Sequence, residues 1–167
     1  ELYCSNPYLF DGYWKLPEKT KEAFRGEYCT VGDMARRDAD GFIHLVDRKS
    51  NMIISGGENI YPAEIENLLA RHPAVLECAV VGLPDPRWGE QVVAVVVLRS
   101  GHLASDEQLL ESVQASLARY KHPRRWVRLQ ALPKTALGKV QKDRLVRLLS
   151  ECADTKATPS GDSPRSL

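Results

Sequence analysis

The sequence lacks any apolar run long enough to cross a membrane: its longest, residues 92–98, has only the length of a buried strand. It also lacks the basic and then apolar opening of a secretion signal. A net charge of +1 provides no general attraction to nucleic acid or to an anionic membrane. We therefore expect no membrane span, no nucleic-acid partner and a cytoplasmic location.

Cysteine and histidine are scarce and dispersed. Cys4, Cys29, Cys78 and Cys152 form no CxxC pair, which argues against a disulfide scaffold or a zinc site and is typical of a reducing compartment. The four histidines are equally scattered, and no GxSxG motif marks a serine nucleophile. We therefore predict no metal site and no serine nucleophile of that type.

What remains is the composition of a globular protein. Hydrophobic residues make up 43% and charged residues 27%, and 167 residues suffice for one compact domain with an additional segment. The strand-like runs 34–37 and 42–46 flank Asp38-Ala39-Asp40-Gly41, a turn signal that predicts a β-hairpin. Residues 151–167 are rich in Ser, Thr, Pro and Gly, and we predict that they form a disordered tail.

Helix and strand signals alternate between the hairpin and the tail. Pro62 suits the first turn of a helix with an apolar stripe, and Ser105 with Gln108 forms a capping-box pattern that starts a second helix. A third helix is expected over residues 142–149. Strands are expected at residues 52–54, 75–81, 92–98 and 125–129. The pattern predicts an α+β fold: a small domain with a short, about three-stranded sheet flanked by helices.

Three polar, glycine-rich clusters are poor choices for a hydrophobic core. They are Tyr28-Cys29-Thr30-Val31-Gly32-Asp33, the stretch from Asp47-Arg48 to Ser55-Gly56-Gly57-Glu58-Asn59, and Pro133-Lys134-Thr135-Ala136-Leu137-Gly138-Lys139. Each has a structural alternative when taken alone: Gly32-Asp33 as a turn, Gly56-Gly57 as a hairpin corner and Lys139 as a solvated cation. The third cluster is no phosphate loop, because the first glycine is missing and Val140 replaces Ser or Thr.

In this order and at these spacings, the clusters resemble the motifs of the adenylate-forming superfamily of acyl- and aryl-CoA ligases, luciferases and peptide-synthetase adenylation domains. The resemblance runs from about Asn6 to Leu149 and is strongest to bacterial CoA ligases, through Met52-Ile53-Ile54-Ser55-Gly56-Gly57-Glu58-Asn59. It implies that residues 1–47 end a large N-terminal, AMP-binding domain. Residues 48–51 would then form a hinge and residues 52–150 a mobile C-terminal lid.

The implied activity is that of an acid–CoA ligase. Such an enzyme joins a carboxylic acid, here a fatty or aryl acid, to ATP as an acyl-adenylate and transfers the acyl group to CoA, releasing pyrophosphate and AMP. ATP/AMP with Mg²⁺, bound mainly by the N-terminal domain, and CoA as co-substrate are implied with it. The sequence contains no Ser/Thr/Gly-rich triphosphate loop, so we expect the chain by itself to be inactive.

Two alternative functions stay open. One is an adenylation domain that loads a carrier protein, which a carrier domain downstream would indicate; the other is a non-catalytic interaction module. The aromatic-rich start of the chain, from Tyr3 to Trp14, is expected to pack on the N-terminal domain or, in its absence, on a second copy of the chain. Self-association is therefore among the expected interactions.

The resemblance assigns four residues to adenylation and lid movement. Asp33 matches the carboxylate whose two oxygens accept from the ribose hydroxyls, and Arg48 matches a second ribose-side contact. Lys139 matches the catalytic lysine, whose ammonium offsets the repulsion between the substrate carboxylate and the triphosphate. Ser50 stands at the pivot, where the family usually has Asp or Lys; a pivot needs tolerant backbone angles more than a given charge.

The resemblance assigns the CoA channel to Gly56, Gly57, Trp88, Tyr120, His122 and Arg124. Glycine permits close approach of the backbone to pantetheine, Trp88 matches an aromatic wall, and Arg124 is the best phosphate ligand among the three nucleotide-side residues. The structural alternatives are that Trp88 packs on the sheet and that Tyr120 merely ends a helix.

Overall fold

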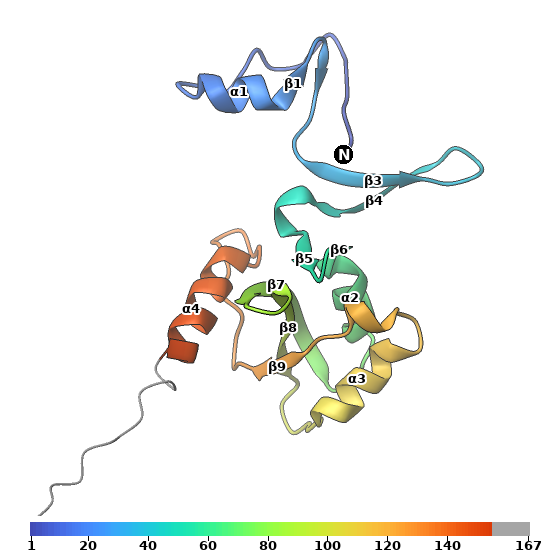
Figure 1. The fold of residues 1–167 in the computed structure, drawn as a ribbon, viewed down its shortest axis with the longest axis vertical. Helices are drawn as coiled ribbons and strands as arrows, with labels where there is room; N and C mark the ends of the chain where they lie inside the picture. The colour runs from blue at the N-terminus through green and yellow to red at the C-terminus, as the bar shows by residue number, and fades with distance from the viewer. Residues whose placement is uncertain (155–167) are drawn as a thin grey trace, which may run out of the picture.

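The computed structural model describes the backbone of residues 1–154 and the side chains of residues 1–151. Its elements are α1 (Pro17–Ala23), β1 (Phe24–Arg25), β2 (Tyr28–Cys29), β3 (Asp33–Arg37), β4 (Ile43–Arg48), η1 (Lys49–Asn51), β5 (Ile53–Ser55), β6 (Glu58–Ile60), α2 (Pro62–Leu69), β7 (Val75–Asp85), β8 (Gly89–Leu98), α3 (Asp106–Gln114), η2 (Arg119–Lys121), β9 (Arg125–Arg128) and α4 (Lys142–Asp154). Figure 1 shows these elements in two groups that meet near η1. We call residues 1–48 the leading segment and residues 53–154 the sheet body.

The leading segment consists of one short helix and two separate two-stranded sheets, β1-β2 and β3-β4. β3 and β4 are antiparallel and pair Asp33 with Arg48 at one end and Arg37 with Ile43 at the other. The predicted hairpin is therefore confirmed. Many large apolar side chains of the leading segment are exposed, including Trp14 at 86%.

The sheet body contains a five-stranded sheet with the order β6-β5-β8-β7, in which β9 also pairs with β8. β7 and β8 form a long antiparallel hairpin, and β9 runs parallel to β8. The predicted α+β class is confirmed, but the expected number of about three strands is too small. The difference arises around Gly56-Gly57, where the three-residue strands β5 and β6 form a tight hairpin that is too short to show a period.

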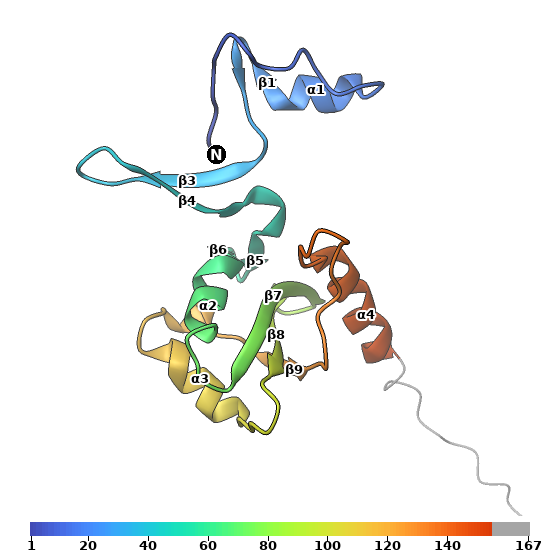
Figure 2. The ribbon, with the colours of Figure 1, turned by 180° about the vertical axis from the view of Figure 1, so that it is seen from behind.

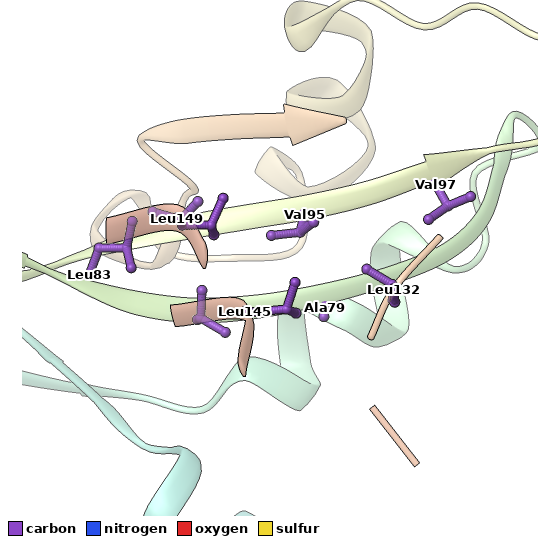
Figure 3. Close-up of a cluster of buried hydrophobic side chains, with 9 residues drawn as sticks. Ala79, Leu83, Val95, Val97, Leu132, Leu145 and Leu149 are labelled. Atoms are coloured by element: carbon purple, nitrogen blue, oxygen red, sulfur yellow. The ribbon is translucent and has the colours of Figure 1, made fainter. Parts of the chain in front are cut away.

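Both faces of the sheet are buried, which explains the continuous apolar run of β8. Successive side chains of a strand point to opposite faces. Val95 packs with Leu145 of α4 on one face (Figure 3), whereas Ala94 packs with Ile65 of α2 and Val113 of α3 on the other. A strand covered on both sides needs apolar residues at every position. Figure 2 shows the same three-layer arrangement from behind, with α4 on one side of the sheet and α2 and α3 on the other.

The helix ends follow their local signals. The capping box at α3 is formed: Ser105 Oγ accepts from Gln108 N, and Gln108 Oε1 accepts from Ser105 N. α4 continues to Asp154, so the first residues of the predicted tail are helical. The rest of that tail, residues 155–167, lies outside the described residues. No helix in the described part of the chain is long and apolar enough to span a membrane.

Candidate functional site

The connection between the two groups is organised by the carboxylate of Asp47. Its Oδ1 accepts hydrogen bonds from Arg48 N (2.7 Å) and from Asn51 Nδ2 (2.8 Å). Its Oδ2 accepts from Ala63 N (2.9 Å) in the first turn of α2. Tyr61, the N-cap residue of α2, makes no capping bond with its side chain. Asp47 therefore satisfies a helix-end donor from outside the helix and links the leading segment to the sheet body.

The two residues predicted to face ribose lie side by side. Asp33 and Arg48 are cross-strand partners in the β3-β4 hairpin, and Arg48 Nε lies 3.4 Å from Asp33 Oδ1. The guanidinium is more exposed than the carboxylate, with side-chain exposures of 60% and 28%. An ion pair this accessible contributes little to stability, so both groups remain available to a ligand.

Lys139 is presented by a closed turn. The ends of this turn are tied by a bridge between Lys134 and Val140, and Thr135 N donates to Lys139 O (2.8 Å) while Thr135 Oγ1 accepts from Lys139 N (3.2 Å). Gly138 has a φ of +83°, a left-handed conformation that favours glycine. The result is an exposed ammonium on a geometrically defined loop.

Lys139 and three residues of the predicted hinge, Arg48, Ser50 and Asn51, line the same cavity, of about 570 Å³. We call it the hinge cavity; its lining residues are Arg48, Ser50, Asn51, Thr135, Lys139, Val140, Gln141, Lys142, Asp143, Arg144 and Arg147. The structure thus brings Lys139 together with Arg48 and Ser50, although ninety positions of sequence separate them. Asp33 joins this group through its contact with Arg48. Five of the eleven lining residues are cationic and one, Asp143, is acidic, so the cavity has an excess of positive side chains that suits a polyanion.

The start of α4, which follows the Lys139 turn, is anchored on α2. Lys142 Nζ lies 2.7 Å from Glu66 Oε1, and the same oxygen accepts a hydrogen bond from Val80 N (2.7 Å) of β7. The Glu66 carboxylate therefore joins a helix, a strand and the base of the Lys139 turn. This contact limits how far the turn can move independently of the sheet body.

A second cavity, of about 700 Å³, lies at the tip of the β7-β8 hairpin and η2. We call it the tryptophan cavity; it is lined by Arg87, Trp88, Arg119, Tyr120, His122, Pro123 and Arg124. Four residues predicted for the CoA channel therefore meet in one place: Trp88, Tyr120, His122 and Arg124. None of its lining residues is shared with the hinge cavity.

Trp88 is the centre of the tryptophan cavity. The guanidinium carbons of Arg124 and Arg87 lie 4.1 Å and 4.8 Å from its ring centroid, within the range of cation–π attraction. Gly56 N donates to Trp88 O (2.8 Å), and a Cβ at Gly56 would lie 2.9 Å from Trp88 Cε3. Gly56 is thus favoured both by the indole packed against it and by its φ of +61°. A Cβ at Gly57 would meet no atom within 4 Å, and its φ of +85° explains the glycine.

The other two predicted CoA residues lie on and after η2. Tyr120 is 40% exposed and belongs to a separate 3₁₀ turn, so it does not end α3. His122 Nε2 lies 3.0 Å from Leu117 O, which leaves its Nδ1 free of that bond. Arg124 is fixed through its backbone, because its N–H donates to Val92 O (2.8 Å) of β8.

The sequence analysis assigned no role to several residues of these sites, among them Arg87, Arg119 and Asp47. Arg87 and Arg119 are immediate neighbours of Trp88 and Tyr120, and two arginines beside two candidate aromatic residues were a usable signal. The bond from Asp47 to Ala63 spans sixteen positions and leaves no local pattern. Sequence reasoning identified the hinge motif but not the contact that holds it.

Comparisons with known proteins show what the chain is similar to. Residues 64–139 match the model of the AMP-binding enzyme C-terminal domain. The chain is 47% identical over 147 residues to a feruloyl-CoA synthase from Amycolatopsis sp., covering 88% of this chain and 30% of that protein. It is 45% identical over 150 residues to the medium/long-chain-fatty-acid–CoA ligase FadD8 of Mycobacterium tuberculosis, covering 85% and 26%. The chain thus spans about a third or less of the length of these relatives.

Solved structures of MatB from Rhodopseudomonas palustris show the same fold in two states. The ATP-bound structure superposes with a TM-score of 0.81 at 37% identity, covering 89% of this chain and 30% of MatB. The apo structure gives 0.66 at 38% identity with the same coverage. The two MatB structures are therefore nearly equal in sequence identity to the chain, and the ATP-bound one has the higher TM-score.

Proposed function

We propose that this chain, whose residues 64–139 match the model of the AMP-binding enzyme C-terminal domain, is the carboxyl-terminal part of an acid–CoA ligase. The complete enzyme would join a carboxylic acid to ATP as an acyl-adenylate with release of pyrophosphate. It would then transfer the acyl group to the thiol of CoA with release of AMP. The observation that carries the proposal is the meeting of Lys139, Arg48 and Ser50 in one cationic cavity.

In the first half reaction, the hinge cavity would face the nucleotide. A carboxylate and a triphosphate repel each other, and a fixed cation stabilises the negative charge that accumulates as they react. Lys139 is exposed on a closed turn and can make this contact. Asp33 would accept from the ribose hydroxyls, with Arg48 beside it at 3.4 Å as a second polar contact.

In the second half reaction, the tryptophan cavity would hold the nucleotide end of CoA. Trp88 and Tyr120 offer aromatic surfaces, and Arg87, Arg119 and Arg124 line the same cavity. Guanidinium groups bind phosphate in a bidentate manner, so three of them fit a ligand with several phosphates. Gly56, whose N–H donates to Trp88 O, and the adjacent Gly57 would border the pantetheine arm.

This cationic lining favours free CoA over a carrier protein as the acceptor. A phosphopantetheine arm attached to a carrier has no adenosine and no 3′-phosphate, and so would leave the arginines of the tryptophan cavity without a partner. Mg²⁺, which accompanies ATP, has no ligand set here: no group of three or more His, Cys, Asp or Glu side chains within residues 1–151 could hold a metal ion. The roles proposed for Lys139, Asp33 and Arg48 do not depend on it.

Binding of CoA to the chain itself tests the acceptor site. Titration calorimetry with CoA, dephospho-CoA and pantetheine should give the tightest binding for CoA and the weakest for pantetheine. Arg124→Ala should weaken CoA binding by roughly tenfold, as expected for the loss of one charge-assisted contact. Arg71→Ala, an exposed arginine outside the cavity, is the matched control and should change nothing. Equal affinity for CoA and pantetheine would contradict the nucleotide site.

A chimera tests the complete reaction. Residues 1–167 would replace the corresponding carboxyl-terminal part of the Amycolatopsis feruloyl-CoA synthase, to which they are 47% identical. The chimera should form feruloyl-CoA from ferulate, ATP and CoA. A folded chimera that releases pyrophosphate without forming the thioester would contradict only the proposal that CoA is the acceptor. One that does neither would contradict the whole proposal.

A further inference from the structure

Cys4 and Cys29 are far apart in the sequence but directly opposite each other in the leading segment. Cys4 N donates to Cys29 O and Cys29 N donates to Cys4 O, each at 2.8 Å, which defines a hydrogen-bonded antiparallel pair. Both cysteines also line one cavity of about 220 Å³ together with Leu2, Leu9, Phe10, Val31 and Asp33. The two side chains therefore emerge on the same side of the strand pair, into a shared and mostly apolar space.

The geometry of such a pair is close to that of a disulfide. Cα atoms of a hydrogen-bonded antiparallel pair lie about 5.5 Å apart, within the range of about 4.4–6.8 Å that disulfides span. The Cβ atoms of a hydrogen-bonded pair lie at the far end of the range of about 4.5–5.5 Å and must approach by roughly 1–2 Å to reach disulfide geometry. Cys4 is paired with Cys29 through an isolated bridge and not within a named strand, so a shift of this size is feasible.

The two thiols differ in access in the way that a two-step oxidation requires. Cys4 is exposed and Cys29 is buried, and both are free thiols. An oxidant can therefore reach the exposed Cys4 first, and the buried Cys29 lies next to it as the second thiol. Cys78 is a useful contrast, because burial raises its pKa to about 11 and keeps it in the unreactive thiol form.

We propose that Cys4 and Cys29 form a redox-reactive dithiol that a peroxide converts to an intramolecular disulfide. The Cys4 thiolate attacks hydrogen peroxide and becomes a sulfenic acid, with hydroxide as the leaving group. The Cys29 sulfur then attacks the Cys4 sulfur; its proton and the departing hydroxyl leave as water. Two thiols and one peroxide thus give one disulfide and two waters, with the peroxide reduced.

The disulfide would fix the segment that leads to Asp33. Leu2 N already donates to Asp33 O (2.7 Å), and Thr30 to Gly32 connect Cys29 to Asp33 along the chain. A covalent bond between Cys4 and Cys29 adds a constraint two residues from the Leu2 contact and draws the walls of the shared cavity together. This consequence for the ribose side rests on the proposed function; the oxidation itself does not.

Non-reducing peptide mapping of the 167-residue chain after treatment with hydrogen peroxide tests the proposal. Trypsin separates Cys4, in residues 1–15, from Cys29, in residues 26–36. The expected product is a linked pair of these two peptides, lighter than their sum by two hydrogen atoms, in a chain that stays monomeric. Two of the four thiols should be lost, and dithiothreitol should restore both.

Cysteine variants test whether the disulfide joins Cys4 and Cys29. Cys4→Ser changes an exposed residue and so preserves the fold; it should abolish the cross-link and leave Cys29 reduced at the same peroxide dose. Cys78→Ser should leave the cross-link unchanged. Oxidation of Cys4 alone to the sulfinic acid, or a disulfide between two chains, would overturn the proposal. So would a cross-link that survives in Cys4→Ser.

Discussion

The leading segment and the sheet body use similar side chains in opposite ways. In the leading segment, Tyr8, Trp14 and Leu45 are exposed at 93%, 86% and 66%. In the sheet body, Leu145 and Val95 are fully buried between α4 and the sheet. Burial of apolar area is the main source of stability, so the two parts differ in what holds them together. The sheet body encloses its own core, and the leading segment requires contacts beyond itself.

Limited proteolysis exposes this difference most directly, and it has the largest expected effect. Cleavage by trypsin requires local opening, whose free energy ranges from near zero in weakly packed segments to the global value in a core. We expect cleavage at Lys15, Lys19 and Lys21 to be roughly 10³-fold faster than at Arg71, leaving a resistant fragment that starts near Lys49. Uniform protection from Glu1 onward in a monomer would show that the leading segment belongs to the same cooperative unit.

Lys139→Ala changes the exposed turn of the sheet body that lines the hinge cavity together with Arg48 of the leading segment. In the chimera with the feruloyl-CoA synthase, we expect adenylation to slow by about 10²–10³, as for the loss of other charge-stabilising groups. Thioester formation from a supplied acyl-adenylate should be spared, because the tryptophan cavity is separate. Pyrophosphate release and CoA consumption, measured independently, distinguish the two steps.

Lys134→Ala is the matched control for this experiment. Lys134 belongs to the same turn but forms an ion pair with Glu77 of β7, so it is directed toward the sheet body. The Lys134→Ala variant should keep the rates of both half reactions within about twofold of those of the parent chimera, as for a change outside the site. Equal loss of both half reactions in Lys139→Ala would contradict a lysine dedicated to adenylation.

The sequence predicted local and periodic features of both parts well, and long-range contacts poorly. The capping box at Ser105 and the helix start at Pro62 were recognisable because each is encoded within a few residues. The β7-β8 strands were recognisable from their β-branched runs. The strand β6 was not predicted because three residues carry no measurable period, although a hairpin corner at Gly56-Gly57 was one of the structural alternatives. The convergence of Lys139 with Arg48 could be expected from the family resemblance alone, since no local rule connects them.

The candidate site residues also divide into those that local sequence motifs reveal and those that only the fold brings together. Asp33, Arg48 and Lys139 stand in glycine-rich motifs that are visible in the sequence, whereas the arginines around Trp88 become a cluster only when η2 folds against the β7-β8 hairpin. Cys4 and Cys29 are the clearest case. Their spacing argued against a disulfide, yet the two strands place them opposite each other. Spacing in the sequence constrains contacts within a helix or a hairpin but not between distant strands.

A pair of leucine substitutions compares the two parts by stability. Leu145→Ala removes a fully buried side chain between α4 and the sheet and should lower the free energy of unfolding by about 2–5 kcal/mol. Leu45→Ala removes a side chain that is 66% exposed in the leading segment and should change it by less than about 0.5 kcal/mol. Urea denaturation of the 167-residue chain measures both. Comparable losses would mean that the leading segment is packed as firmly as the sheet body.

Asp47→Ala concerns the contact that joins the two parts and has the smallest expected effect. The carboxylate accepts from Ala63 N at 2.9 Å and from Asn51 Nδ2 at 2.8 Å, and Tyr61 provides no side-chain cap of its own. Loss of a helix-capping group costs about 1 kcal/mol, which corresponds to about a fivefold change in an equilibrium constant.

We therefore expect trypsin to cleave after Lys49 about fivefold faster in Asp47→Ala, with a slightly lower urea midpoint for the sheet body. Asp40→Ala, in the exposed turn of the β3-β4 hairpin, is the matched control and should change neither quantity. Asp47→Asn separates charge from hydrogen bonding, since its amide oxygen can accept from Ala63 N but its NH₂ cannot accept from Asn51. For Asp47→Asn we expect a rate of cleavage after Lys49 between those of the parent chain and of Asp47→Ala. If Asp47→Ala is cleaved no faster than the parent chain, the bond from Asp47 to α2 does not hold the two parts together in solution.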